Sequence, residues 1–166
     1  MKKDFIIIMG SDGSGKTTIA RGLSESLGYE VRHCGPPKDK QDGFNQYFNF
    51  IKDNNENVIF DRFHEGEAIF APLYRGYDGS DYFPYLEEQL KEKFNPLLVL
   101  AYAPYDIIVE RLNTRGEDFV RPEHFKVAYD KATDVFNKSS LPKMIINTHD
   151  NSCDDNVLKI IKQIKN

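Results

Sequence analysis

A glycine-rich stretch near the start of the chain has the residue types and spacing of a loop that holds phosphate groups. It matches the pattern G-x-x-x-x-G-K-S/T at every defined position and consists of Gly10, Ser11, Asp12, Gly13, Ser14, Gly15, Lys16, Thr17 and Thr18. Glycines let backbone N–H groups turn toward a polyphosphate, because side chains would block the approach. Lys16 then reaches the β- and γ-phosphates, and the Thr17 hydroxyl ligates Mg²⁺. We therefore predict that this stretch binds ATP together with Mg²⁺.

The residues on either side of the loop predict the strand and the helix that such a site needs. The apolar run from Phe5 to Met9 precedes the loop, and the segment from Thr17 to Leu27 has helical spacing. The helix N-terminus adds its positive dipole end to the site. A glycine-rich hairpin turn is the alternative, but a hairpin requires a second strand directly after the turn. The strand, loop and helix context favours phosphate binding.

A charged pair follows a later apolar run. Val58 to Phe60 is typical of a buried parallel strand, and Asp61 and Arg62 come directly after it. Ligands of open α/β sheets bind at the carboxyl ends of the strands. We therefore expect Asp61 to reach the metal and Arg62 to hold a phosphate with two hydrogen bonds. The alternative is a surface ion pair, worth at most about 1 kcal/mol.

Three arginines surround a glycine-containing turn at 116–118. Arg111, Arg115 and Arg121 predict a short lid at about 111–122 that brings positive charge onto transferring phosphates. A solvated helix end is the alternative, since arginines also suit the negative end of a helix dipole. His64, which has no recognisable partner motif, is expected to be structural.

Apolar runs and helical patterns alternate along the whole chain. Strands are expected at 5–9, 29–33, 58–60, 97–102 and 143–148, and helices at 17–27, 44–52, 82–94, 104–112, 122–136 and 157–164. Residues 63–77 are expected to form a loop that leads into a helix ending near Gly76. This alternation predicts an α/β fold in which helices flank a five-stranded, mainly parallel sheet. The length of 166 residues indicates one domain, covering 1–166.

The composition of the chain limits the classes of protein to which it can belong. A hydrophobic content of 40% and a charged content of 29% are typical of a soluble globular protein. The net charge of −4 argues against a nucleic-acid partner. Cys34 and Cys153 lack the spacing of a disulfide framework, which indicates the cytoplasm. The first apolar run is too short for a signal peptide, and we expect no membrane span. Whether the chain forms a homodimer stays open.

Other motifs narrow the class of nucleotide-binding protein. The chain has no N-K-x-D sequence of the kind that reads guanine, and a motor or transporter ATPase would normally need a longer chain. The phosphate loop, the segment Asp61-Arg62-Phe63-His64 and the stretch from Arg111 to Arg121 resemble the phosphate loop, the D-R-Y/H segment and the lid of thymidylate kinases. The resemblance implies the kinase type of P-loop NTPase fold. It also implies transfer of the γ-phosphoryl group of ATP, with Mg²⁺, to dTMP or a related deoxynucleoside monophosphate.

The resemblance also implies roles for individual residues. Asp12 would meet the 3′-hydroxyl of the acceptor sugar, and Arg62 would hold the acceptor phosphate. Arg115 and Arg121 would neutralise charge in the transition state. A carboxylate about 6 Å from a phosphate charge costs about 3 kcal/mol at an effective dielectric constant of 20, so Asp12 needs a compensating role of this kind.

The chain departs from thymidylate kinases in two respects. It is shorter than is usual for them, and the segment from Phe63 to Gly76 lacks their serine and glutamine residues. Leu73 to Gly76 occupies that place, which would make Arg75 the residue that reads the acceptor base.

Three alternatives remain beside the leading hypothesis of dTMP phosphorylation. The stretch from Glu110 to Glu117 is also similar to the lid of deoxynucleoside kinases, whose acceptor carries no phosphate. Those enzymes have Glu-Arg-Ser where this chain has Asp61-Arg62-Phe63, which favours the monophosphate acceptor. A kinase acting on a modified base or hydroxyl in DNA is disfavoured by the acidic net charge. The third alternative is a switch protein that binds ATP without turnover.

Overall fold

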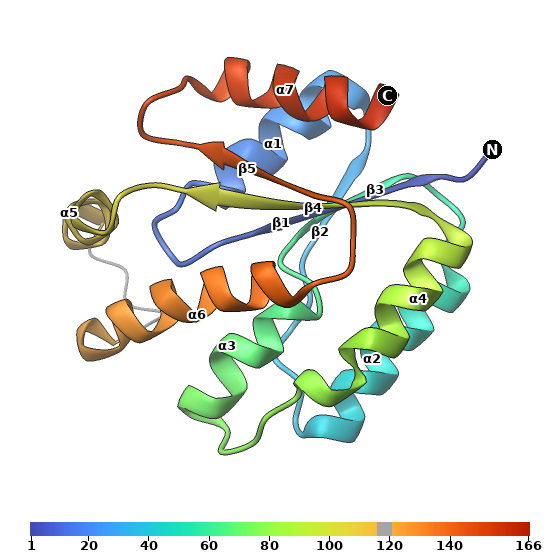
Figure 1. Ribbon diagram of the computed structural model, residues 1–166, viewed down its shortest axis with the longest axis horizontal. Helices are drawn as coiled ribbons and strands as arrows, with labels where there is room; N and C mark the ends of the chain where they lie inside the picture. The colour runs from blue at the N-terminus through green and yellow to red at the C-terminus, as the bar shows by residue number, and fades with distance from the viewer. Residues whose placement is uncertain (116–120) are drawn as a thin grey trace.

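One parallel sheet forms the middle layer of the structure (Figure 1). The structure is a computed structural model that describes residues 1–115 and 121–166. The strands lie in the order β2-β3-β1-β4-β5, and every pairing is parallel. Their bounds are β1 (Asp4–Met9), β2 (Glu30–Arg32), β3 (Val58–Asp61), β4 (Asn95–Tyr102) and β5 (Lys143–Asn147). The predicted five-stranded sheet is confirmed.

Helices cover both faces of the sheet (Figure 1). On one face lie α1 (Lys16–Leu27) and α7 (Cys153–Lys165). On the other lie α2 (Lys40–Asp53), α3 (Glu65–Tyr74), α4 (Phe83–Lys93) and α6 (Phe125–Lys138). Helix α5 (Tyr105–Arg115) follows the carboxyl end of β4, and two 3-10 turns, Ser80–Tyr82 and Pro122–His124, precede α4 and α6. In the part of the chain that the structure describes, none of the helices is long and apolar enough to cross a membrane.

Alternation along β1 explains why helices pack on both of its faces. Phe5, Ile7 and Met9 contribute to the core beneath α2, α3, α4 and α6, whereas Ile6 and Ile8 contribute to the core beneath α1 and α7. Ile8 is level with Asp61 of β3 in the sheet. The register therefore brings Asp61 to the end of β1, where the glycine-rich loop begins.

Aromatic packing fixes the turn between β3 and α3. Phe63 is 1% exposed and lies 5.1 Å from the Phe5 ring and 4.5 Å from the Phe60 ring, measured between centroids. Tyr47 of α2 closes the other side at 5.0 Å. Because Phe63 is anchored in the core, the two residues before it, Asp61 and Arg62, are held at the edge of the sheet.

Two helices begin one turn before their apolar stripes do. Helix α2 was expected from residue 44 but begins at Lys40, because the Asp39 side chain accepts a hydrogen bond from the Asp42 backbone N–H at 2.9 Å. Helix α7 was expected from residue 157 but begins at Cys153, with the Ser152 hydroxyl accepting from the Asp155 N–H at 3.1 Å. Polar N-caps start these helices, and hydrophobic spacing does not detect them.

A buried hydrogen-bond network joins α4 to the loop between α6 and β5. The Glu87 carboxylate accepts hydrogen bonds from the Ser139 hydroxyl at 2.7 Å, and from the N–H and the hydroxyl of Ser140 at 2.7 and 2.8 Å. His64 Nε2 lies 3.1 Å from the same carboxylate, and His64 is 1% exposed. His64 is thus structural, as predicted. Burial alone would raise the pKa of Glu87, but the His64 and serine contacts hold it at about 2.

This network predicts a pH-dependent contribution to stability. Because the pKa of Glu87 is lowered on folding, its contribution is present above pH 4.5 and is lost as the pH falls toward 2. Glu87→Gln should lower the free energy of unfolding at pH 7 by about 2 kcal/mol, as measured by urea denaturation, and by clearly less at pH 3. Glu88→Gln, on the exposed side of α4, is the matched control. An equal loss at both pH values for Glu87→Gln would show that the charge of Glu87 has no role.

Candidate active site

The glycine-rich loop joins β1 to α1 in a conformation that only glycine accommodates. Gly10 has φ 147°, and a Cβ atom there would lie 2.6 Å from Ser14 Oγ and 2.7 Å from the Ala101 carbonyl oxygen. Gly15 occupies the N-cap position of α1 with φ 92° and has no side chain that could cap the helix. The N–H groups of the first turn therefore remain available to an anion.

Lys16 lies folded into this loop. Its ammonium group donates a hydrogen bond to the Ser11 carbonyl oxygen at 2.8 Å, and the residue is 6% exposed. Burial lowers the pKa of Lys16 to about 8, although the negative charges of Asp61 and Glu65 oppose the decrease. The cation that would meet phosphate groups is thus held in place before a ligand arrives.

If the loop binds the phosphates of ATP, as the sequence predicts, the pKa of Lys16 determines how this binding depends on pH. Above pH 8 the free protein loses the positive charge at Lys16, so kcat/KM for ATP should fall about tenfold per pH unit there. Bound phosphates favour the charged form, so kcat itself should stay level to a higher pH. Steady-state kinetics from pH 6.5 to 9.5 measures both quantities. A kcat/KM that stays constant to pH 9.5 would contradict this role for Lys16.

Thr17 and Asp61 meet at the carboxyl edge of the sheet. The Thr17 hydroxyl donates a hydrogen bond to Asp61 Oδ2 at 2.7 Å, and Asp61 is 7% exposed. A hydroxyl beside a carboxylate is the donor set that Mg²⁺ takes in nucleotide sites, so these two side chains fit that metal. His33 Nδ1 lies 3.8 Å from Asp61 Oδ2. The sequence did not indicate that His33 lies at this site, because the strand before it, β2, is short and half exposed.

Asp12 and Arg62 form an ion pair across the loop. Arg62 has φ 68°, and its guanidinium lies 4.7 Å above the Phe70 ring. Both side chains keep hydrogen-bonding capacity, because neither Asp12 Oδ2 nor Arg62 Nε has a hydrogen-bond partner within residues 1–115 and 121–166, although both atoms are buried. The pair therefore offers one acceptor atom and one donor atom to a ligand.

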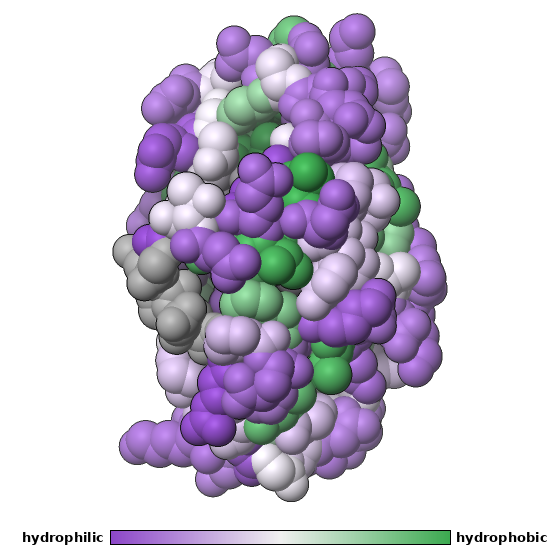
Figure 2. Space-filling view, turned by 90° about the vertical axis from the view of Figure 1, so that its left-hand side faces the viewer, coloured by the Kyte–Doolittle hydropathy of each residue, from purple (hydrophilic) through white to green (hydrophobic). Residues whose placement is uncertain are grey.

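Three adjoining cavities surround these residues. The central cavity, of about 580 Å³, contains Lys16, Thr17 and Asp61. It shares Gly13, Gly15, Thr18 and Arg115 with a cavity of about 760 Å³, and Asp12, Cys34 and Arg62 with a cavity of about 320 Å³. Figure 2 turns this carboxyl end of the sheet toward the viewer and shows a mostly hydrophilic surface around smaller hydrophobic areas. We call the two outer cavities the donor-side cavity (760 Å³) and the acceptor-side cavity (320 Å³), after the substrates that the function proposed below would place in them.

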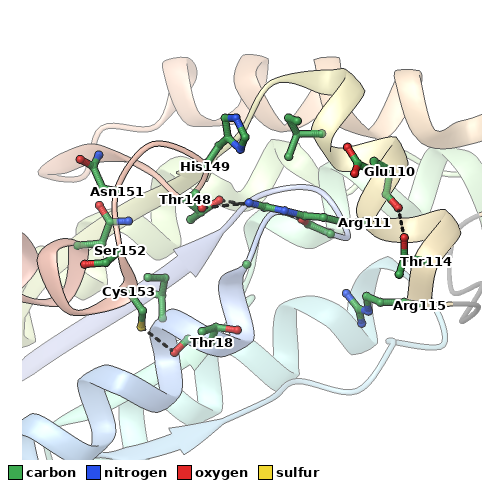
Figure 3. A pocket seen from close by; sticks show the side chains of 15 residues that line it. Thr18, Glu110, Arg111, Thr114, Arg115, Thr148, His149, Asn151, Ser152 and Cys153 are labelled. Atoms are coloured by element: carbon green, nitrogen blue, oxygen red, sulfur yellow. Dashed lines mark hydrogen bonds between the residues drawn. The ribbon is translucent and has the colours of Figure 1, made fainter.

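The donor-side cavity lies between α5 and the segment that joins β5 to α7 (Figure 3). Arg111 links its walls by donating hydrogen bonds to the Gly13 carbonyl oxygen at 3.1 Å, and to the Thr148 hydroxyl and carbonyl oxygens at 3.1 and 3.0 Å. Thr148 in turn donates to the Ser14 carbonyl oxygen at 2.7 Å. Arg111 is therefore bound to the glycine-rich loop and supports it.

The other two arginines of the predicted lid have different surroundings. Arg115 lines both the donor-side and the central cavity. The Arg121 backbone N–H donates to the Tyr74 hydroxyl at 3.2 Å, and Tyr74 lines the acceptor-side cavity. The glycine-containing turn of the predicted lid, at 116–118, lies outside the described residues.

The acceptor-side cavity combines aromatic rings with a second ion pair. Its aromatic lining residues are Tyr47, Phe63, Phe70 and Tyr74. Arg75 lies in its wall and is paired with Glu67, which also accepts a hydrogen bond from the Tyr77 hydroxyl at 2.7 Å. Glu67 is 2% exposed. We did not predict it as a site residue from the sequence, although its position among the apolar residues of α3 indicates that it is buried.

Several solved structures share this architecture, two of the three described here being kinases. The YorR protein of Bacillus subtilis, in complex with phosphorylated GDP, is 23% identical over 97% of this chain and 95% of its own, with a TM-score of 0.84. Deoxyadenosine kinase of M. mycoides with bound dATP is 20% identical over 98% and 99%, with a TM-score of 0.66. Shikimate kinase of Acinetobacter baumannii is 16% identical over 99% and 94%, with a TM-score of 0.55.

Sequence comparisons add no closer assignment, since no protein-family model and no curated protein matches the chain. The parallel five-stranded sheet, its flanking helices and the glycine-rich loop after β1 agree with the fold of these solved structures. The chain has the P-loop kinase fold.

Proposed function

We propose that this protein transfers the γ-phosphoryl group of ATP to the phosphate of a deoxynucleoside monophosphate, with dTMP as the leading acceptor. The observation that carries the proposal is the position of Arg62, which lies in the wall shared by the central and acceptor-side cavities. A guanidinium there holds an acceptor phosphate beside the place where Lys16 holds the donor phosphates.

The donor half of the reaction uses the glycine-rich loop. The triphosphate of ATP binds to the loop and to Lys16 in the central cavity, and its base enters the donor-side cavity between α5 and Thr148. Thr17 and Asp61 would hold Mg²⁺, which would neutralise phosphate charge. Arg115, which lines both cavities, and Arg121 compensate the charge that develops during transfer.

The acceptor half uses the unsatisfied atoms of the Asp12–Arg62 pair. Arg62 Nε donates to an acceptor phosphate, and Asp12 Oδ2 accepts a hydrogen bond from a sugar hydroxyl. Both contacts form without breaking the ion pair. The base then lies among the aromatic rings of the acceptor-side cavity, where Arg75 reads it from its fixed place beside Glu67. Phosphoryl transfer follows from positioning and charge stabilisation, since the protein forms no covalent bond.

A deoxynucleoside kinase is the second candidate. The Asp12 carboxylate within the loop could accept the proton of an attacking hydroxyl, which favours this candidate. The residues on either side of Arg62 argue for the monophosphate, because deoxynucleoside kinases have glutamate and serine where this chain has Asp61 and Phe63.

ADP release in the presence of ATP and Mg²⁺ distinguishes these candidates. The acceptors to compare are dTMP, the other three deoxynucleoside monophosphates and thymidine. We expect strong stimulation by dTMP and weak stimulation by thymidine. Stimulation by thymidine alone would assign a nucleoside kinase, and stimulation by another monophosphate would reassign the base. If every acceptor fails while ATP still binds, the protein is a switch or acts on a polymer, and the proposal is wrong.

A further inference from the structure

The backbone conformation of Arg62 needs support from its surroundings. Arg62 is the one residue other than glycine with a positive φ in the described ranges, at 68°. Side chains disfavour this left-handed conformation because Cβ approaches the carbonyl oxygen. Its own N–H donates to the Ile8 carbonyl oxygen at 3.1 Å, which fixes the peptide before Arg62 to β1.

Glu65 fixes the peptide on the other side of Arg62. The Phe63 N–H donates to both oxygens of the Glu65 carboxylate, at 3.1 and 2.9 Å. Glu65 is 2% exposed, and its neighbours Phe63 and Gly66 line the acceptor-side cavity. The carboxylate therefore lies behind the cavity wall and acts on the turn that carries Arg62.

Basic side chains lie near the buried carboxylate of Glu65. Burial raises the pKa of Glu65, whereas the nearby His64 and Arg62 oppose that rise, and His64 Nδ1 lies 4.0 Å from Glu65 Oε2. Lys16 interacts with the same charge. A buried carboxylate is tolerated only when it is paired and hydrogen-bonded, and this arrangement meets both conditions.

We propose that Glu65 is the positioning residue of the acceptor site. By holding the peptide between Arg62 and Phe63, it keeps Arg62 in the left-handed conformation that directs the guanidinium at Asp12 and at the acceptor phosphate. This inference rests on the proposed function for the role of Arg62 as the acceptor-phosphate ligand. Glu65 contacts no substrate in it.

Steady-state kinetics of conservative variants tests this role. Glu65→Ala should raise KM for the acceptor monophosphate about tenfold or more, whereas Glu65→Gln, whose amide oxygen can still accept from Phe63 N–H, should raise it by about threefold at most. In both variants, KM for ATP should change less than KM for the acceptor. Glu65→Asp, which keeps the charge but shortens its reach, replaces Glu65→Ala if that variant does not fold. Glu87→Gln is the matched control, a buried glutamate whose loss should destabilise the fold without an acceptor-specific effect.

Two further results separate positioning from general destabilisation. In an Arg62→Ala background, Glu65→Ala should change kcat/KM for the acceptor by less than about twofold, because the side chain that it positions is gone. The inference would be overturned if Glu65→Ala lowered kcat/KM for the acceptor as much in the Arg62→Ala background as in the wild type. Equal increases in KM for ATP and KM for the acceptor would also overturn it.

A crystal structure of Glu65→Ala or Glu65→Asp gives a readout that needs no turnover. Loss of the positive φ at Arg62 and of the Asp12 contact is expected, and an unchanged Arg62 would overturn the inference. If the wild type shows no acceptor-dependent turnover, the proposed function is wrong, and this structural comparison still decides the role of Glu65.

Discussion

Replacing Lys16 with alanine should lower kcat about 10³-fold or more and leave the fold intact. Lys16 is the cation enclosed by the glycine-rich loop, bonded to Ser11 and 6% exposed. An isolated donor aimed at developing charge contributes about 10²–10³-fold to a rate, and a cation on a transferring phosphoryl group contributes more. Acceptor-dependent ADP release under saturating ATP measures the effect.

Two comparisons accompany the Lys16 variant. Lys138→Ala, an exposed position in the last turn of α6, should keep wild-type turnover. Lys16→Arg should remain impaired, because the larger guanidinium does not fit the space enclosed by the loop. Turnover of the Lys16→Ala variant at the wild-type rate would show that the phosphates of ATP do not bind in the glycine-rich loop.

Replacing Arg62 with alanine should lower kcat/KM for the acceptor monophosphate about 100-fold and change KM for ATP little. Hydrogen bonds to charged groups contribute about 1.5–3 kcal/mol, and the loss also leaves the Asp12 carboxylate without its counter-ion. Initial rates with each substrate varied in turn measure the two effects separately.

Arg32→Ala is the control for the Arg62 variant, because Arg32 is an exposed arginine at the end of the neighbouring strand β2. An equal loss toward ATP and the acceptor would place Arg62 on the donor side. An unchanged kcat/KM for the acceptor would contradict a phosphate-binding role.

The fold could be predicted from local patterns, because these patterns are the physical causes of the fold. The runs at 5–9, 58–60 and 97–102 are strands because both of their faces are buried. The glycine-rich loop was recognisable because its geometry admits few residue types at Gly10 and Gly15.

Parts of the site depend on contacts between segments far apart in the sequence, which spacing does not reveal. Arg111 was grouped with a lid, yet its partners are Gly13 and Thr148. Glu65 and Glu67 look alike two positions apart on one helix, but Glu65 turns back to the Phe63 N–H, whereas Glu67 pairs with Arg75. The sequence predicts that Asp12 and Arg62 belong to one site. It does not predict their direct ion pair, because that contact depends on the pairing of β1 with β3.

Identifying the labelled product tests most directly whether the protein transfers the γ-phosphoryl group of ATP to dTMP. ATP labelled in its γ-phosphate is incubated with the protein, Mg²⁺ and dTMP, and the labelled products are separated and identified. We expect label in dTDP, with none formed by the Lys16→Ala variant. Label found only in inorganic phosphate, or no transfer to any deoxynucleoside monophosphate, would contradict it.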